Sequence, residues 1–456
     1  MVHIGLGAFH RAHQAVYNEK LITAGDRRWG ILGVSLRDPV PAAILAAQDH
    51  LFSVTQRHGE MAKTQVIGSL YGALHSPSAL EQVLQAIANP QVHIVSTTVT
   101  EKGYCQSPAT TDLDFNDPGI IHDLAFPDAP VTVLGVLSAG IRKRPANAPL
   151  TLLCCDNMAG NGDKLRKLLV QFAKQTDTDL ANRIEHDIGI PNSMVDRIVP
   201  AATPESLQWA SSLVGLRDEA AIVCEPFTQW VIEDRFAGTR PAWEDVGVVL
   251  TSDVRPYQEM KLRLLNGTHS AIAYAGQLCG LETVADVMKD PEVGVFVRQL
   301  MRNDLRTSVT CPPGYDIDSY CDDLLDRFTN RSLGHRTEQI AMDGTQKVPV
   351  RWLPAIRESL QSGKPLSALE RSLAIWLFYL DRQRNDGGHA LRINDVGATD
   401  LVARLHSATT TRDLVHAALG YTKVFGHAEW PSSFVERLIG HFNILREKGI
   451  YALINA

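Results

Sequence analysis

The sequence lacks several features that mark specialised classes of protein. Its seven cysteines are an odd number and form neither a Cys-x-x-Cys pair nor a Cys/His zinc spacing, so we interpret them as buried thiols in a reducing compartment. No run of about 18 apolar residues occurs, and no basic leader followed by an apolar stretch opens the chain. Neither secretion nor membrane spanning is supported, and the expected location is the cytoplasm.

An excess of positive charge is also missing. The 456 residues include 44 Lys and Arg against 51 Asp and Glu, a net charge of -7, with 45% hydrophobic and 21% charged residues. This composition is typical of a soluble globular protein without a basic surface for nucleic acid or anionic membrane. The length predicts two domains of roughly 200 residues each. We expect a monomer or a small homo-oligomer with a small-molecule substrate.

The first half alternates short apolar runs with helix-like stretches. Val2–Ile4, Gly30–Leu36, Val92–Val99 and Thr151–Cys155 are strand-like, and His13–Ala24 is helix-like. This alternation predicts an α/β domain with a mostly parallel sheet and crossover helices.

The second half has a different periodicity. Val246–Thr251 is the last strand-like run, and Pro256 then fits a helix start. From there the pattern is helical, as in Leu366–Tyr379. We therefore predict two domains, 1–252 with the sheet and 253–456 mainly α-helical.

A glycine-containing turn follows the first strand. In residues 3–13 (HIGLGAFHRAH), Gly5 allows a tight turn and Gly7 lets backbone N–H groups approach a pyrophosphate, as in a Rossmann-type dinucleotide site. His10 stands where the usual fingerprint has its third glycine, so the pattern is incomplete. An ordinary glycine-rich strand-to-helix turn is the alternative.

Other cofactor contacts are expected around this turn. Ala8 and Phe9 open the following helix, and Arg11 is either a cation near the phosphates or a solvent-exposed side chain. At the end of the second strand, Asp38 favours NAD because an acidic residue there holds the ribose hydroxyl, while Arg37 keeps NADP as an alternative.

The segment Tyr257–Ser270 carries the most chemistry. On a regular helix of about 100° per residue, Lys261, His269 and Asn266 fall at about 0°, 80° and 140°, so they share one face. A base and hydrogen-bond donors on one face suit the oxidation of a secondary alcohol. The alternative is a solvated lysine, a capping asparagine and a core histidine.

Several motifs in order resemble one family. They are Gly5–Gln14 (GLGAFHRAHQ), Thr100–Tyr104 (TEKGY), Cys155–Asn157 (CDN) with Asn161-Gly162, Pro191–Ile198 (PNSMVDRI), Glu225–Phe227 (EPF) with Gln229–Val231 (QWV), and Lys261–Ser270. With them, the chain resembles the long-chain polyol dehydrogenases, which include mannitol 2-dehydrogenases and fructuronate reductases (D-mannonate oxidoreductases). The resemblance runs from residue 3 to beyond residue 350.

This resemblance implies a lysine base at Lys261, oxyanion-stabilising amides at Asn157 and Asn266, a substrate-binding histidine at His269, and no zinc. Asn157 also follows a predicted strand, which places it at the carboxyl edge of the sheet, where open α/β folds bind ligands.

Two departures bear on the substrate. Mannitol dehydrogenases of the family commonly carry a glutamate where this chain has Gln258, with Glu259 one place on, so proton release is expected to take a different route. Residues 333–347 are more similar to fructuronate reductases, and Gln339 stands where mannitol dehydrogenases tend to have an arginine. Lys102 points the same way.

These departures favour a sugar acid over a polyol. The carboxylate of a sugar acid needs a charged or bidentate partner, for which Arg336, His335 and Lys102 are the candidates. Arg336 could equally pair with a surface acid. The leading hypothesis is therefore a D-mannonate/D-fructuronate oxidoreductase, the second a mannitol or arabinitol dehydrogenase, and the third a non-catalytic dinucleotide sensor.

Overall fold

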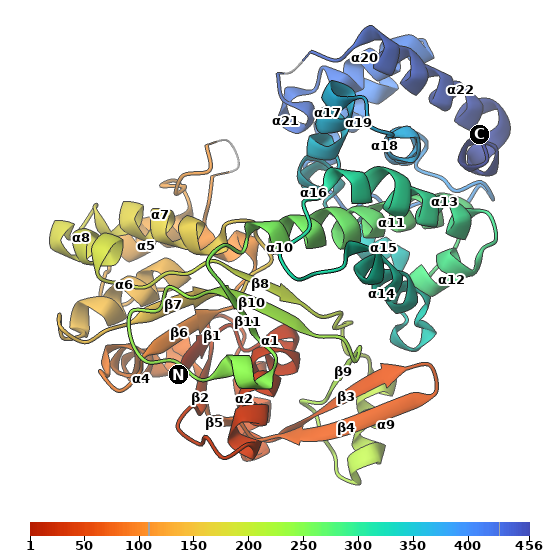
Figure 1. Cartoon of the computed structure of the whole chain (residues 1–456). Helices are drawn as coiled ribbons and strands as arrows, with labels where there is room; N and C mark the ends of the chain where they lie inside the picture. The colour runs from red at the N-terminus through yellow and green to blue at the C-terminus, as the bar shows by residue number, and fades with distance from the viewer. Residues whose placement is uncertain (108–109, 428) are drawn as a thin grey trace. The chain divides into compact units, whose positions relative to one another are not determined.

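The computed structural model describes residues 1–107, 110–427 and 429–456. The chain divides into two compact units, Met1–Arg255 and Pro256–Ala456. The first contains the β-sheets and the second is built from helices (Figure 1).

A five-stranded sheet is the centre of the N-terminal unit. It consists of β1 (Val2–Ile4), β2 (Ile31–Ser35), β5 (Leu70–His75), β6 (Ile94–Thr97) and β7 (Thr151–Cys154). The strand order is β5-β2-β1-β6-β7, and every pairing is parallel. The predicted parallel sheet is confirmed. Because the order reverses between β1 and β6, the carboxyl ends of these strands form a topological switch point.

Both faces of this sheet are covered, which explains the continuous apolar runs of its strands. Val95 and Leu152 pack in one core cluster with apolar residues of α4, α6 and α7. Their neighbours Ile94 and Leu153 belong to a different cluster that contains Trp230. Successive strand residues therefore face opposite layers, as a period of two requires.

The remaining elements of the N-terminal unit flank the central sheet (Figure 1). Two three-stranded sheets, of order β4-β3-β9 and β11-β10-β8, were not predicted as such. The elements are β3 (Phe52–His58), β4 (Met61–Ile67), β8 (Ser193–Asp196), β9 (Ile222–Cys224), β10 (Gln229–Glu233) and β11 (Val249–Thr251), with α1 (Ala8–Ala12), α2 (Gln14–Thr23), α3 (Val40–Ala47), α4 (Ser76–Ala88), α5 (Pro118–Ala125), α6 (Val133–Lys143), α7 (Asn161–Ala173), α8 (Thr178–His186) and α9 (Pro204–Val214).

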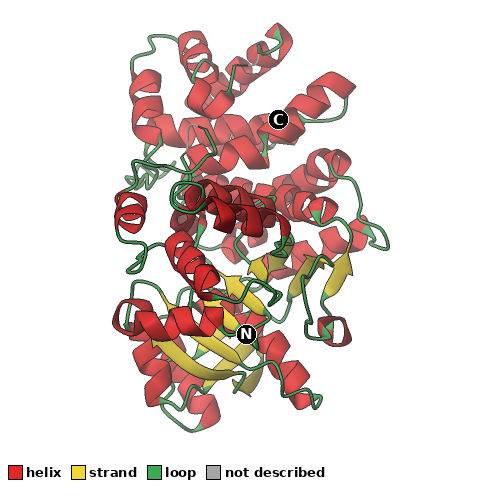
Figure 2. Ribbon diagram, turned by 90° about the vertical axis from the view of Figure 1, so that its left-hand side faces the viewer, coloured by secondary structure: helices red, strands yellow, loops and turns green. Residues whose placement is uncertain are grey.

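The C-terminal unit is built from helices, whereas the described strands all lie in the N-terminal unit (Figure 2). Most residues of its helix α11 (Thr268–Cys279) are buried. A π-helical segment, Lys261–Gly267, joins α10 to α11, and a second one, Leu300–Leu305, follows α13. The other helices are α10 (Arg255–Met260), α12 (Val284–Lys289), α13 (Val293–Gln299), α14 (Ile317–Thr329), α15 (Thr337–Ala341), α16 (Gly344–Arg351), α17 (Leu353–Ser362), α18 (Ser367–Arg382), α19 (Ala398–His406), α20 (Thr411–Leu419), α21 (Thr422–Phe425) and α22 (Ser432–Ile454).

This architecture confirms the predicted fold class, a Rossmann-type parallel sheet followed by a mainly α-helical half. The interpretation of the cysteines needs one correction. All seven are free thiols, but Cys311 is exposed and Cys279 only partly buried. Cys311 lies in the loop before α14, where the chain runs over the surface. Across the described residues, no helix is both long and apolar enough to cross a membrane.

Candidate active site

A cavity of about 240 Å³ lies at the carboxyl ends of β1, β2 and β6. Gly5 and Gly7 line it from the turn after β1, and Asp38 lines it from the loop after β2. Thr98 and Gly103 contribute from the segment after β6. This is the switch point of the parallel sheet, where open α/β folds bind their ligands.

Gly5 is required by the backbone itself. Its φ is +110°, and a Cβ at this position would lie 2.0 Å from the carbonyl oxygen of Thr98. Gly7 has a different role, because the nearest atom to a Cβ there would be 4.0 Å away. Gly5 therefore permits the tight turn, and Gly7 leaves open space beside the cavity.

The residues after the turn are placed unevenly with respect to the cavity. Ala8 and Phe9 open α1, and the ring of Phe9 stacks on that of His13 at 5.1 Å. The structure does not bring Arg11 to the cavity lining, because its guanidinium donates to the carbonyl of Ala220 and lies 5.6 Å from the centre of the Phe52 ring. Burial lowers the pKa of Arg11 to about 10.

His10 fills the position of the missing third glycine. It is fully buried, and its ring stacks on that of His3 with centroids 3.3 Å apart. Burial, with the nearby His3 next, lowers the pKa of His10 well below its usual value. The side chain is thus a neutral part of the layer beneath the turn.

Asp38 is exposed at the end of β2, and its Oδ1 accepts a 2.9 Å hydrogen bond from the backbone nitrogen of Val40. Arg37 is also exposed and lines the same cavity. An acidic and a basic side chain therefore share this rim.

The carboxyl end of β7 carries Asn157, whose side chain is exposed. The preceding Asp156 is buried and accepts hydrogen bonds from the Tyr104 hydroxyl at 2.6 Å and from the backbone nitrogen of Thr100 at 2.7 Å. Burial raises the pKa of Asp156. Lys102 lies on the one-turn helix Glu101–Tyr104 and is exposed.

In the C-terminal unit, Lys261, Asn266 and His269 are all buried, with 7%, 7% and 6% of their surface exposed. Lys261 and Asn266 lie in the π-helical segment, so the assumption of a regular helix with about 100° per residue is wrong here. A π turn closes with i→i+5 bonds, which makes residues five apart neighbours along the axis. Lys261 and Asn266 have this spacing.

His269 lies in a cation-rich environment. Its ring centroid is 4.6 Å from that of Phe328 and 5.4 Å from that of His335, and its Nε2 is buried without a hydrogen-bond partner. Burial lowers the pKa of His269 well below its usual value, and four nearby groups lower it further. They are His335, Arg351, Arg327 and Lys261.

The proposed carboxylate partners occupy different places. Arg336 is 59% exposed and lies 3.8 Å from a carboxylate oxygen of Glu282. His335 contacts His269, and burial followed by the charge of Lys347 lowers the pKa of His335 to about 4. The Lys347 ammonium donates to the carbonyl of Ile340 at 3.0 Å.

Sequence reasoning did not single out Arg327, Lys347 or Arg351. One signal was available for Arg351, which lies between Pro349, a proline inside a helix, and Pro354, which marks the start of the next helix. Nearer the lysine, Glu259 pairs with Arg263 at 2.6 Å and so does not face Lys261 as an unpaired carboxylate.

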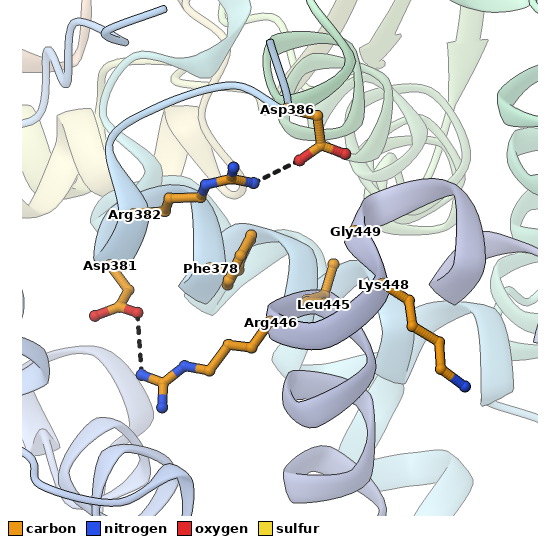
Figure 3. A pocket seen from close by; sticks show the side chains of 8 residues that line it. All are labelled: Phe378, Asp381, Arg382, Asp386, Leu445, Arg446, Lys448 and Gly449. Carbon is orange, nitrogen blue, oxygen red and sulfur yellow. Dashed lines mark hydrogen bonds and ion pairs between the residues drawn. The ribbon is translucent and has the colours of Figure 1, made fainter. Parts of the chain in front are cut away.

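A second, larger cavity of about 540 Å³ lies between α18 and α22 (Figure 3). Charged residues that line it pair with one another: Arg382 with Asp386 at 2.5 Å and Arg446 with Asp381 at 3.3 Å. It contains none of the residues predicted for chemistry. In residues 1–107, 110–427 and 429–456, no group of three or more His, Cys, Asp or Glu side chains is placed to hold a metal ion.

Comparisons with known proteins cover both units. The family model of the mannitol dehydrogenase Rossmann domain matches residues 1–245, and that of the mannitol dehydrogenase C-terminal domain matches residues 253–445. The D-mannonate oxidoreductase of Escherichia coli is 40% identical over 457 residues, covering 98% of this chain and 93% of that protein. The mannitol 2-dehydrogenase of Phaeosphaeria nodorum is 38% identical over 413 residues, covering 89% and 72%.

Solved structures give the same picture. Mannitol 2-dehydrogenase from Pseudomonas fluorescens, in a ternary complex with NAD and D-mannitol, is similar with a TM-score of 0.87 and 35% identity, covering 100% of this chain and 93% of that one. A D-sorbitol dehydrogenase in substrate-free form has a TM-score of 0.90 and 32% identity, covering 99% and 94%.

Proposed function

Because the chain belongs to the mannitol dehydrogenase family, we propose that it is a cytoplasmic, NAD-dependent and metal-independent oxidoreductase acting on a secondary alcohol. The favoured reaction is the interconversion of D-mannonate and D-fructuronate. In this proposal, residues 1–252 are the dinucleotide-binding domain and residues 253–456 the catalytic and substrate domain.

The cavity at the switch point supports dinucleotide binding. Gly5 and Gly7 give the tight turn and the open approach that a pyrophosphate needs, and the Asp38 carboxylate stands where a ribose hydroxyl would be held. Ala8 and Phe9 would contact the same ligand from α1. When bound, NAD supplies the hydride acceptor or donor. The similar mannitol 2-dehydrogenase from Pseudomonas fluorescens was solved in a complex with NAD, which supports this cofactor.

Lys261 is the proposed general base. Lys261 is buried. Like Arg351 and Arg327, it lowers the pKa of the neighbouring His269. Burial disfavours the charged form of a lysine, which suits a base that must take up a proton. In alcohol oxidation Lys261 takes the hydroxyl proton, and Asn157 and Asn266 donate hydrogen bonds to the oxygen as negative charge develops on it. His269 binds the substrate.

The single observation that supports a sugar acid as the substrate is the positive charge around His269. Apart from Lys261, which acts as the neutral base in this proposal, the charged groups that act on the pKa of His269 are Arg351 and Arg327, and Lys347 acts on the adjacent His335. A carboxylate is stabilised by such surroundings, whereas a neutral polyol gains little. For binding a substrate carboxylate next to His269, we favour His335 and Lys347 over Arg336, because Arg336 is exposed and lies beside Glu282. Lys102 remains a candidate from the N-terminal unit.

A polyol dehydrogenase is the second candidate, favoured by the similarity to mannitol 2-dehydrogenases. Steady-state assays with D-mannonate, D-mannitol and D-arabinitol in the presence of NAD distinguish the two. The proposal predicts that kcat/KM for mannonate exceeds that for either polyol by more than tenfold, about 1.4 kcal/mol of transition-state discrimination. A polyol preference of that size contradicts it. Loss of activity on treatment with a chelator would contradict metal independence.

A further inference from the structure

Two backbone carbonyls of the π-helical segment Lys261–Gly267 accept hydrogen bonds from side chains outside the segment. Nη1 of Arg351 donates to the carbonyl of Asn266 at 3.1 Å, and the indole Nε1 of Trp352 donates to the carbonyl of Gly267 at 2.9 Å. Nη1 of Arg351 also donates to Oγ of Ser270 at 2.9 Å. Consecutive residues of the chain thus bind consecutive carbonyls of the π turn.

The local sequence explains why Arg351 and Trp352 are available for this. Pro349 lies inside α16 and removes a backbone donor, and α16 ends two residues later at Arg351. Pro354 then occupies the first turn of α17, where a proline fits. Trp352, between the helices, has φ -118° and ψ -42° and is fully buried. Its indole N–H would otherwise have no partner in the core, so the bond to Gly267 satisfies both groups.

Arg263, within the segment, makes further contacts. Its guanidinium pairs with Glu259 at 2.6 Å and with Glu358 of α17 at 2.5 Å. The π segment is therefore tied to its neighbours by Arg351 and Trp352, which donate to its carbonyls, and by its own Arg263, which pairs with Glu358 of α17.

We infer that Arg351 and Trp352 are positioning residues, which hold the π turn in the geometry that turnover at Lys261 and Asn266 requires. The inference rests on the proposed function, because it takes Lys261 as the base. Trp352 is assigned no contact with substrate or cofactor, and Arg351 is assigned none beyond its contribution to the positive charge around His269. If the turn relaxed toward a regular helix, Lys261 and Asn266 would rotate relative to each other, and a displacement of about 1 Å can cost roughly a hundredfold in rate.

The test compares Arg351→Met with Arg357→Met. Arg357 lies on α17, and its Nη2 donates to the carbonyl of Phe425 at 2.5 Å, so its loss also removes a bond from an arginine to a backbone carbonyl. We expect Arg351→Met to lower kcat for alcohol oxidation roughly 10- to 100-fold, with the Kd for NADH changed less than about twofold. Arg351→Lys keeps a cationic donor and should recover most of kcat. Arg357→Met should lose comparable stability in urea unfolding but keep kcat within about threefold of the parent protein.

Equal kcat values for folded Arg351→Met and Arg357→Met would overturn the inference. If Arg351→Met does not fold, Trp352→Phe decides, because it removes the indole N–H while keeping an aromatic ring, although it also leaves a small cavity at this buried position. A folded Trp352→Phe with lower kcat and unchanged NADH affinity supports the inference, and one with unchanged kcat overturns it. Lys261→Ala distinguishes a failure of the positioning inference from a failure of the proposed function. If Lys261→Ala is inactive while Arg351→Met is fully active, only the positioning inference is wrong.

Discussion

The hydroxyl of Tyr104 donates a 2.6 Å hydrogen bond to Oδ2 of Asp156, and both side chains are buried. This bond fastens the segment after β6 to the carboxyl end of β7, next to Asn157. Val99 and Gly103 of the fastened segment line the proposed dinucleotide cavity. The same pair thus connects the cofactor cavity to one of the proposed catalytic amides.

Tyr104→Phe should therefore affect both stability and cofactor binding. It leaves the buried Asp156 carboxyl without its O–H donor, which is expected to cost about 1–3 kcal/mol of unfolding free energy. Urea unfolding measures this, and NADH fluorescence titration should show weaker binding. Tyr71→Phe is the control, since Tyr71 is 61% exposed and should change neither quantity. Equal behaviour of the two variants would show that the bond does not shape the cavity.

Gly5→Ala and Gly25→Ala form a matched pair. Their φ angles are +110° and +107°, but a Cβ at Gly5 would lie 2.0 Å from Thr98 while one at Gly25 would have nothing within 4 Å. Gly25→Ala should cost only the strain of a positive φ, about 1–2 kcal/mol. Gly5→Ala should destabilise more and abolish NADH binding. Similar losses in thermal unfolding for both variants would mean that the close approach to Thr98 is unimportant.

Asp38→Asn tests cofactor choice. An asparagine retains the side-chain acceptor for the backbone nitrogen of Val40, so little stability should be lost. It removes the negative charge that favours a free ribose hydroxyl over a phosphate. The ratio of kcat/KM for NAD to that for NADP should fall by roughly tenfold, equivalent to about 1.4 kcal/mol. An unchanged ratio would indicate that Asp38 does not contact the ribose.

Stability should fall on mild acidification because several histidines are buried in neutral form. Burial lowers the pKa of His3 to about 3 and that of His335 to about 4, and it lowers the pKa of His10 and His269 well below the usual value. Between pH 6.5 and 4 the unfolded chain binds these protons and the folded chain does not, so stability rises with pH across this window. Each histidine contributes about 1.4 kcal/mol of unfolding free energy per pH unit there.

Urea unfolding at several pH values from 7 to 4 measures this slope. His335→Gln should make the slope smaller, because one of the proton-binding sites of the unfolded chain is removed. Unfolding free energy that stays constant or increases toward pH 4 would contradict the prediction.

The parts of the fold that depend on short-range pattern were predictable from sequence. The runs that became β1, β2, β6 and β7 are apolar on both faces, and Gly5 and Gly7 mark the turn after β1. The hairpin of β3 and β4 was missed because β4 is largely exposed and has no continuous apolar run. Its pairing with β9 joins segments far apart in sequence, which local patterns do not reveal.

The chemistry of the C-terminal unit was only partly predictable. Lys261, Asn266 and His269 were singled out by residue type and by the resemblance to the polyol dehydrogenases, and all three are buried. The π turn that carries two of them was not predicted, because it depends on Arg351 and Trp352, about 85 residues further along the chain. Arg11 shows the opposite case. Its position at a helix start pointed to phosphate, whereas its guanidinium binds Ala220, a contact set by tertiary packing.

The central claim is that Lys261 is the base, and the turnover of Lys261→Ala tests it most directly. The measurement is kcat for D-mannonate oxidation with NAD at neutral pH, alongside Lys289→Ala, which removes an exposed lysine from the end of α12. We predict that Lys261→Ala lowers kcat by at least about 100-fold while its NADH affinity and unfolding midpoint stay close to those of Lys289→Ala. A folded Lys261→Ala protein with kcat near that of the parent would contradict the assignment.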